Sequence, residues 1–159
     1  MTGESVASSS ERPSRARPAL ILLAEDSPSD AALTAAALVE GGIECELAVV
    51  SDGEAAMGFL RRTGSYTTAA RPDLILLDLN LPKKDGREVL CEVKGDPALS
   101  SIPLIIFTTS AAGGDILRAY EHGANSYVTK AVDFDDLATC VRRIADFWLS
   151  LVRLPAGGQ

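Results

Sequence analysis

Short apolar segments alternate with helical patterns along most of this chain, and that alternation restricts the fold more than any other feature of the sequence. Five segments have the length and composition of β-strands, and three of them are almost continuous apolar runs of four or five residues. Such runs suit strands that are covered on both faces of a sheet. The second segment is less uniformly apolar, so we expect it nearer an edge. The predicted strands are 20–24, 45–50, 73–77, 103–107 and 125–129.

Helices are predicted between these strands, and several have recognisable ends. Ser27 is a candidate N-cap, because a proline follows it directly and the acidic Asp30 stands three residues later. The helix that starts there should end at Gly41-Gly42. Ser51 and Asp52 can cap the second helix. The remaining helices are predicted over 86–95, 113–122 and 133–152.

This order of elements predicts an α/β fold, doubly wound around a five-stranded parallel sheet. Right-handed crossovers place helices on both faces of such a sheet. Ligands then bind in the crevice beyond the carboxyl ends of the strands. The residues that directly follow each strand are therefore the candidates for a functional site.

The composition of the 159 residues is that of one globular domain, which we place at 19–153. Residues 1–18 are rich in Ser, Pro and Arg, so we expect a disordered tail there and a short C-terminal tail at 154–159. A basic interaction patch is the alternative interpretation of the first tail. It would consist of Arg12, Arg15 and Arg17.

The overall charge and the cysteines exclude several classes of function. A net charge of −7 argues against nucleic-acid binding, which needs a basic surface. No apolar run approaches the ~20 residues that span a membrane, and the N-terminus lacks the apolar core of a secretory signal. Cys45, Cys91 and Cys140 form no metal or redox motif. We expect a cytoplasmic protein.

Polar and charged residues follow four of the predicted strands. Glu25 and Asp26 follow the first, Asp78 the third, Thr108 the fourth and Lys130 the fifth. Two carboxylates ~4 Å apart repel by about 4 kcal/mol at an effective dielectric constant of 20. Such a cluster either holds protons or recruits a hard divalent cation, and Mg²⁺ prefers these oxygen ligands.

The same residues have the chemistry of phosphoryl transfer. A carboxylate such as Asp78 can attack a phosphoryl group and form an acyl phosphate. A metal ion and Lys130 would neutralise the charge that develops on the phosphoryl oxygens. The Thr108 hydroxyl could then hydrogen-bond the bound phosphoryl group.

Each residue also has a purely structural interpretation. Glu25 and Asp26 could simply favour the positive N-terminus of the next helix. Thr108 could satisfy its own backbone, and Lys130 alone would most often be a surface lysine. His122 stands near a helix C-terminus with no nucleophile placed beside it, which disfavours a hydrolase triad.

The segments ILLAEDSPSD, PDLILLDLNLPKKDG, PLIIFTTS and GANSYVTK resemble the receiver domains of bacterial response regulators, over about residues 20–150. The resemblance implies a flavodoxin-like fold with strand order 2-1-3-4-5. It also implies a two-component signalling role, with a sensor histidine kinase as the phosphoryl donor. The receiver would catalyse only its own phosphorylation and autodephosphorylation.

The resemblance also assigns roles to individual residues. Asp78 matches the phosphoacceptor, Asp26 a direct Mg²⁺ ligand, and Glu25 a second acid that acts through water. Asn80 matches the position that offers its backbone carbonyl to the metal. Three further matches are Thr108 as the switch hydroxyl, Lys130 as the phosphate-contacting lysine and Tyr127 as the rotameric aromatic on the output face.

One position departs from the family pattern. Receivers usually have proline after the lysine, often with a cis peptide bond, whereas this chain has Ala131. A cis bond before a residue other than proline costs about 2.5–4 kcal/mol. We therefore expect a trans bond between Lys130 and Ala131.

The C-terminal FWLSLVRLP, together with GSYTTAARPDLILLDLNLP, further resembles single-domain regulators that are paired with phytochrome-type histidine kinases, including bacteriophytochromes. The predicted last helix has an apolar stripe that suits packing on the sheet, and Phe147, Leu149 and Leu154 extend beyond it. We expect a homodimer through this helix, with Phe147, Trp148 and Leu149 at the interface. The alternative is that the helix end folds back on its own chain. The stripe consists of Phe134, Leu137, Ala138, Val141, Ile144, Ala145 and Trp148, with Leu151 or Val152.

Two other functions compete with the signalling role. A Mg²⁺-dependent aspartyl-phosphate phosphatase would also use a strand-end aspartate, but such enzymes usually carry a second Asp where this chain has Asn80. A scaffold that is never phosphorylated would not need the complete set of charged residues. About six residues follow the last predicted helix, so we expect output through protein contacts or a phosphorelay.

Overall fold

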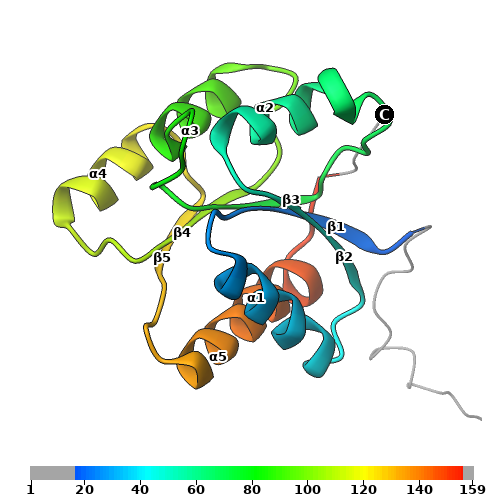
Figure 1. Ribbon diagram of the computed structural model, residues 1–159, viewed down its shortest axis with the longest axis vertical. Helices are drawn as coiled ribbons and strands as arrows, with labels where there is room; N and C mark the ends of the chain where they lie inside the picture. Colours follow the sequence, from blue (N-terminus) through cyan, green and yellow to red (C-terminus); the bar gives the residue numbers. More distant parts are fainter. Residues whose placement is uncertain (1–16, 156–159) are drawn as a thin grey trace, which may run out of the picture.

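The computed structural model describes residues 17–155, which form a five-stranded parallel sheet with helices on both faces (Figure 1). The strand order is β2-β1-β3-β4-β5, which confirms the predicted doubly wound α/β fold. The second strand lies at an edge, as expected. The strands are β1 (Ala19–Ala24), β2 (Cys45–Val50), β3 (Leu74–Leu77), β4 (Leu104–Thr108) and β5 (Ser126–Thr129).

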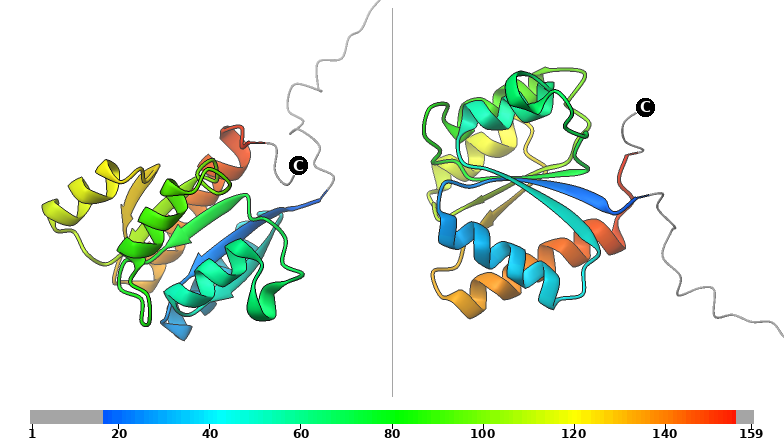
Figure 2. Two further views of the ribbon diagram at one scale, coloured as in Figure 1. Left: turned by 90° about the horizontal axis from the view of Figure 1, so that it is seen from above. Right: turned by 45° about the vertical axis from the view of Figure 1, so that its right-hand side comes forward.

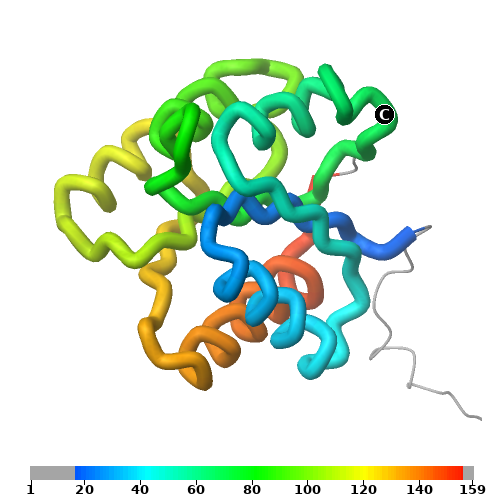
Figure 3. Tube along the Cα trace, viewed as in Figure 1, coloured from blue at the N-terminus to red at the C-terminus, as the bar shows by residue number. Residues whose placement is uncertain are grey.

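Two layers of helices cover the sheet. Helices α1 and α5 pack side by side on one face, and α2, α3 and α4 cover the other (Figures 1 and 2). The Cα trace follows the same arrangement (Figure 3). Among the described residues, no helix is both long and apolar enough to cross a membrane. The helices are α1 (Pro28–Glu40), α2 (Gly53–Arg61), α3 (Gly86–Gly95), α4 (Gly113–Glu121) and α5 (Phe134–Ala145).

The sheet separates two apolar cores, and β1 contributes to both. Leu20 and Leu22 pack in the core beneath α2 and α3, whereas Ile21 and Leu23 pack in the core beneath α1 and α5. Successive side chains of a strand point to opposite faces. A strand buried on both faces therefore needs apolar residues at every position, which is why β1 is a continuous apolar run.

The predicted helix starts are largely confirmed. The Ser27 hydroxyl accepts a hydrogen bond from the Asp30 N–H (3.2 Å), which makes Ser27 the N-cap of α1. Asp52, rather than Ser51, caps α2 by accepting from the Ala55 N–H (2.7 Å). Such caps satisfy N–H groups that have no partner within the helix.

The last predicted helix differs from expectation in two ways. Instead of one helix over 133–152, α5 ends at Ala145 and a π-helix follows over Asp146–Leu151. The wider π turn rotates the side chains that follow it. Trp148 and Leu149, which lie within this π-helix, pack partly against the core under α1 and α5.

The predicted apolar stripe was also wrong at its first residue. Phe134 is 64% exposed, because it is the first residue of α5 and precedes the part that covers the sheet. Burial on that face begins with Leu137. Within the described residues no peptide bond is cis, so the bond between Lys130 and Ala131 is trans, as predicted.

Both predicted tails lie mainly outside the described residues. Residues 1–16 and 156–159 belong to those segments and are not described. At the boundary, the Arg17 guanidinium pairs with the Asp73 carboxylate (3.1 Å) at the amino end of β3. The proposed basic patch at Arg12 and Arg15 therefore stays a prediction.

Candidate phosphorylation and metal site

The sheet register brings the first two strand-end acids together. Ala24 of β1 lies opposite Leu77 of β3, so the next residues, Glu25 and Asp78, become neighbours at the carboxyl edge of the sheet. The Asp78 N–H donates to the Ala24 carbonyl (3.1 Å), which continues the strand pairing into the site. Both carboxylates are buried.

The pairing of β4 with β5 delivers the hydroxyl and the ammonium. Thr108 lies opposite Thr129, and the next N–H, that of Lys130, donates to the Thr108 carbonyl (2.7 Å). The Thr108 hydroxyl donates to Oδ1 of Asp78 (2.8 Å). Thr108 was predicted to follow its strand, but it is the last residue of β4.

The Lys130 ammonium lies at the centre of the site. Its Nζ is 2.5 Å from Oε1 of Glu25, 3.2 Å from Oδ2 of Asp78 and 3.1 Å from Oδ2 of Asp30. The side chain is only 4% exposed. The interpretation of Lys130 as an ordinary surface lysine is therefore wrong, since this ammonium is buried among carboxylates.

An acidic cluster stands beside the lysine. Carboxylate oxygens of Glu25, Asp26 and Asp78 all lie within 4.8 Å of one another. Glu25 and Asp78 are buried, whereas Asp26 is exposed to solvent. A set of oxygen donors, part of it open to water, suits a hard divalent cation that keeps some of its water ligands. The residues that were predicted to bind metal therefore fit such an ion.

Asn80 is the exception among the predicted metal ligands. Its backbone N–H donates to Oδ1 of Asp78 (3.1 Å) and so orients that carboxylate. The predicted role of its backbone carbonyl at the metal stays a prediction.

The electrostatics of the site follow from one ammonium shared by several acids. Burial alone would lower the pKa of Lys130, but the hydrogen bond to Glu25 and the charges of Asp78 and Glu25 raise it. Burial raises the pKa of Glu25 above its usual value, and Lys130 only partly opposes this. Three carboxylates surround this one ammonium, so the lysine remains charged. Its single positive charge cannot balance all three acids.

Tyr127 links the site to the loop after β4. Its hydroxyl donates to the Ser110 carbonyl (2.8 Å), and its ring packs partly against the core on the α2 and α3 side. The Ser110 hydroxyl in turn donates to Asp115 at the start of α4 (2.7 Å). The tyrosine is therefore in contact with the loop that follows Thr108. Its predicted role as a rotameric switch stays a prediction.

Two features of the site were not identified from the sequence. Asp30 was interpreted only as an acid in the first turn of α1, yet it contacts Lys130. Gly86 begins α3 against the backbone after β3, where an added Cβ would lie 2.1 Å from the Asp78 carbonyl oxygen. The only indication of the role of Gly86 in the sequence was the Asp85-Gly86 pair, which was interpreted as a turn and helix start.

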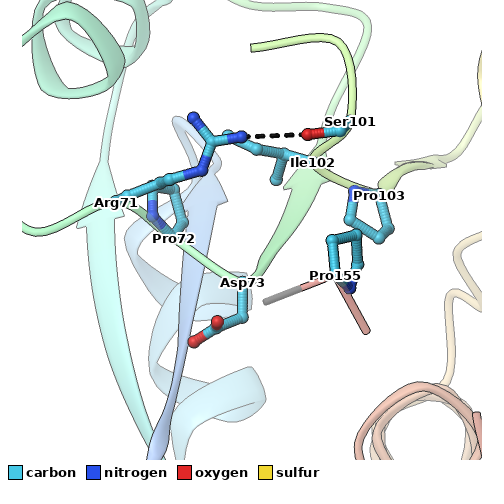
Figure 4. Close-up of a pocket in the computed structure, with 7 residues that line it drawn as sticks. All are labelled: Arg71, Pro72, Asp73, Ser101, Ile102, Pro103 and Pro155. Atoms are coloured by element: carbon cyan, nitrogen blue, oxygen red, sulfur yellow. Dashed lines mark hydrogen bonds between the residues drawn. The ribbon is translucent and has the colours of Figure 1, made fainter. Parts of the chain in front are cut away.

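A small pocket occurs at the opposite, amino edge of the sheet (Figure 4). Its volume is only about 10 Å³, which is room for roughly one water molecule. The pocket is lined by Arg71, Pro72, Asp73, Ser101, Ile102, Pro103 and Pro155.

The strand order and the converging acids, hydroxyl and ammonium define the receiver class of signalling domains. Residues 21–142 match the response regulator receiver domain family. The chain belongs to this family and functions as a response-regulator receiver.

Its relatives include response regulator Rcp1 of Synechocystis sp., which is 49% identical over 139 residues, or 87% of this chain and 95% of that protein. The probable methanogenesis regulatory protein FilR2 of Methanothrix harundinacea is 38% identical, with 87% of this chain and 88% of that protein covered.

Solved structures agree with the fold. The Mn²⁺-bound form of Rcp1 has a TM-score of 0.84 at 49% identity, and the comparison covers 87% of this chain and all of that one, 100%. The phosphorylated cyanobacterial phytochrome response regulator RcpA also has a TM-score of 0.84, at 46% identity, covering 87% and 99% of the two chains. A divalent metal is therefore bound in a homologous receiver structure.

Proposed function

We propose that Asp78 accepts a phosphoryl group from a sensor histidine kinase in a Mg²⁺-dependent reaction. The observation that supports this most directly is the position of the Asp78 carboxylate. It lies beside Glu25 and Asp26, within 2.8 Å of the Thr108 hydroxyl and 3.2 Å of the Lys130 ammonium. The nucleophile, a hydroxyl, an ammonium and carboxylates that could hold a metal ion thus lie around the Asp78 carboxylate.

Each side chain of the site has a separate role in phosphoryl transfer. A carboxylate oxygen of Asp78 attacks the phosphorus, and the P–N bond to the kinase histidine breaks as the new P–O bond forms. Lys130 stabilises negative charge on the phosphoryl oxygens, and Thr108 can turn its hydroxyl to the bound phosphoryl group. Glu25, Asp26 and Asp78 would hold the Mg²⁺, which supplies further charge neutralisation when bound.

Labelling with a small phosphodonor tests this proposal. Acetyl phosphate with Mg²⁺ should add one phosphoryl group to the wild type, measured by intact mass, and Asp78→Asn should abolish the addition. Asp96→Asn is a matched control, because it lies at the far end of α3, about 15 Å from the first residue of that helix. Full labelling of Asp78→Asn would contradict the assignment.

The kinase partner is proposed to be of the phytochrome type. The support is the similarity to RcpA, which is a phytochrome response regulator, over 87% of this chain. Phosphotransfer profiling should show faster transfer from a phytochrome-type kinase than from unrelated histidine kinases. Equal rates from all kinases would remove the support for this pairing.

Neither alternative function fits the site as well. A phosphatase would need an acid–base carboxylate two residues after Asp78, whereas Asn80 presents only an N–H to Asp78. A scaffold would not need a buried lysine held by three acids. Output by protein contact or phosphorelay, a cytoplasmic location and the absence of nucleic-acid binding stay predictions.

A homodimer through the C-terminal segment is part of this proposal, with a revised set of contacts. Phe147 is 47% exposed and Leu151 is 73% exposed on the π-helix. Trp148 and Leu149, which were also predicted at the interface, pack partly against the core of their own chain. The exposed pair is therefore the better candidate for contact with a second copy.

A further inference from the structure

We propose that Asp30 is a positioning residue that holds the Lys130 ammonium in place for phosphoryl transfer. This inference rests on the proposed function and adds a residue to it. Oδ2 of Asp30 lies 3.1 Å from Nζ of Lys130, although the two residues are 100 apart in the chain. An ammonium has three N–H donors. Glu25, Asp30 and Asp78 provide one carboxylate for each of them.

Asp30 differs from Glu25 and Asp78 because it does not belong to the acidic cluster that would bind the metal. The carboxylate oxygens that gather within 4.8 Å belong to Glu25, Asp26 and Asp78. When a cation and a phosphoryl group engage those acids, their hold on the lysine weakens. Asp30 is the partner that can keep one N–H fixed while the others turn to the phosphoryl oxygens.

The backbone of Asp30 is itself anchored. Its N–H donates to the Ser27 hydroxyl (3.2 Å), and its carbonyl accepts from the hydroxyl of Thr34 (2.8 Å), which is buried. The carboxylate is therefore carried by a rigid first turn of α1. The Lys130 side chain has a flexible stem, and its backbone N–H, directly after β5, donates to the Thr108 carbonyl at the end of β4.

Holding a charged group within a few tenths of an ångström is worth a large factor in rate, since a misplacement of about 1 Å can cost about 100-fold. The contact of Lys130 with Asp30 does not draw it away from the phosphoacceptor, because Nζ remains 3.2 Å from Asp78 at the same time. Loss of Asp30 should therefore slow phosphorylation rather than speed it.

A first-turn acid can also act only through the helix dipole, and the chain offers a matched control for that role. Asp136 occupies the same position in α5, three residues after its N-cap, and its N–H donates to the Asp133 side chain as that of Asp30 does to Ser27. Asp136 is exposed. Asp136→Asn removes the dipole interaction alone.

The test compares phosphorylation rates by acetyl phosphate at saturating Mg²⁺. Asp30→Asn should lower the rate about tenfold, and Asp136→Asn should change it less than about twofold. In a Lys130→Met background, which keeps the apolar stem, Asp30→Asn should have no further effect, because the aspartate acts through the lysine. An equal loss in both backgrounds, or a faster Asp30→Asn variant, would overturn the proposal.

A second measurement does not depend on phosphorylation. In metal-free protein, the Lys130 ammonium should give a slowly exchanging ¹H–¹⁵N signal that weakens in Asp30→Asn and persists in Asp136→Asn. An unchanged signal in Asp30→Asn would refute the positioning role even if the rates differ. If the wild type is not phosphorylated at all, the proposed function fails, and the NMR result still decides whether Asp30 positions Lys130.

Discussion

Four carboxylates gather at the carboxyl edge of this sheet around one ammonium, which contacts three of them, and this excess of negative charge governs the behaviour of individual residues. Glu25, Asp26 and Asp78 cluster together, while Lys130 contacts Glu25, Asp78 and also Asp30. Uncompensated buried charge is costly. The site therefore sacrifices some stability in the metal-free state, and a cation or a proton would relieve the repulsion.

This excess of negative charge predicts that the difference in stability between Glu25→Gln and the wild type depends on pH. The pKa of Glu25 is raised in the folded state above its ordinary value of 4.5, mainly by burial. Above its folded pKa, ionised Glu25 destabilises the fold, because its charge is better solvated in the unfolded chain than in the buried site. Below pH 4.5 it is protonated in both states, so that cost is absent.

Glu25→Gln should accordingly unfold at higher denaturant concentration than the wild type at pH 7 without metal. The difference should shrink as the pH falls through the folded pKa and vanish below about 4. Urea titrations of both proteins across this range, monitored by circular dichroism, would measure it. A variant less stable than the wild type at pH 7 would show that the bond to Lys130 outweighs burial.

At the scale of elements, the start of α3 is pressed against the segment that carries the phosphoacceptor. The Gly86 N–H donates to the Leu79 carbonyl (2.9 Å), and Asp85 and Glu88 form a capping box around this helix start. The close approach is possible because residue 86 has no side chain. The helix thereby fixes the backbone of Asp78 and Leu79 from one side.

Gly86→Ala should disturb both the fold and the site. The new Cβ would lie 2.1 Å from the Asp78 carbonyl oxygen, so backbone must shift. We expect a loss of about 3 kcal/mol in the free energy of unfolding, as for severe overpacking, and slower labelling of Asp78. Gly95→Ala, at the other end of the same helix, meets no atom within 4 Å and should be neutral or stabilising. Equal stability of the two variants in denaturant titrations would contradict this account.

At the scale of the whole molecule, the exposed C-terminal pair predicts self-association. Phe147→Lys with Leu151→Glu should give a folded monomer, because both side chains are exposed and their replacement leaves the core intact. Val39→Glu is a control, since this apolar residue of α1 is 79% exposed yet lies outside the C-terminal segment. Light scattering at high micromolar concentration would measure the mass of each. A wild type that is monomeric, both with and without phosphoryl label, would exclude the dimer.

Much of the fold and most of the site could be predicted from the sequence. A strand buried on both faces must be apolar at every position, so β1 and β3 are visible as continuous runs. In a parallel sheet, the carboxyl ends of the strands meet at one edge. Residues such as Asp78 and Lys130 are therefore brought together by strand order and register alone.

Other features were decided only by the tertiary structure. Asp30 and Asp136 have the same local pattern, three residues after a helix N-cap, yet only Asp30 contacts Lys130. Similarly, the local pattern did not show that the last helix changes to a π-helix after Ala145, or that Leu149 packs against the core. Local sequence determines where a helix starts and which residues share a face. The rotation of that helix against a distant strand depends on how both cores pack, and that rotation decides which acid reaches the lysine.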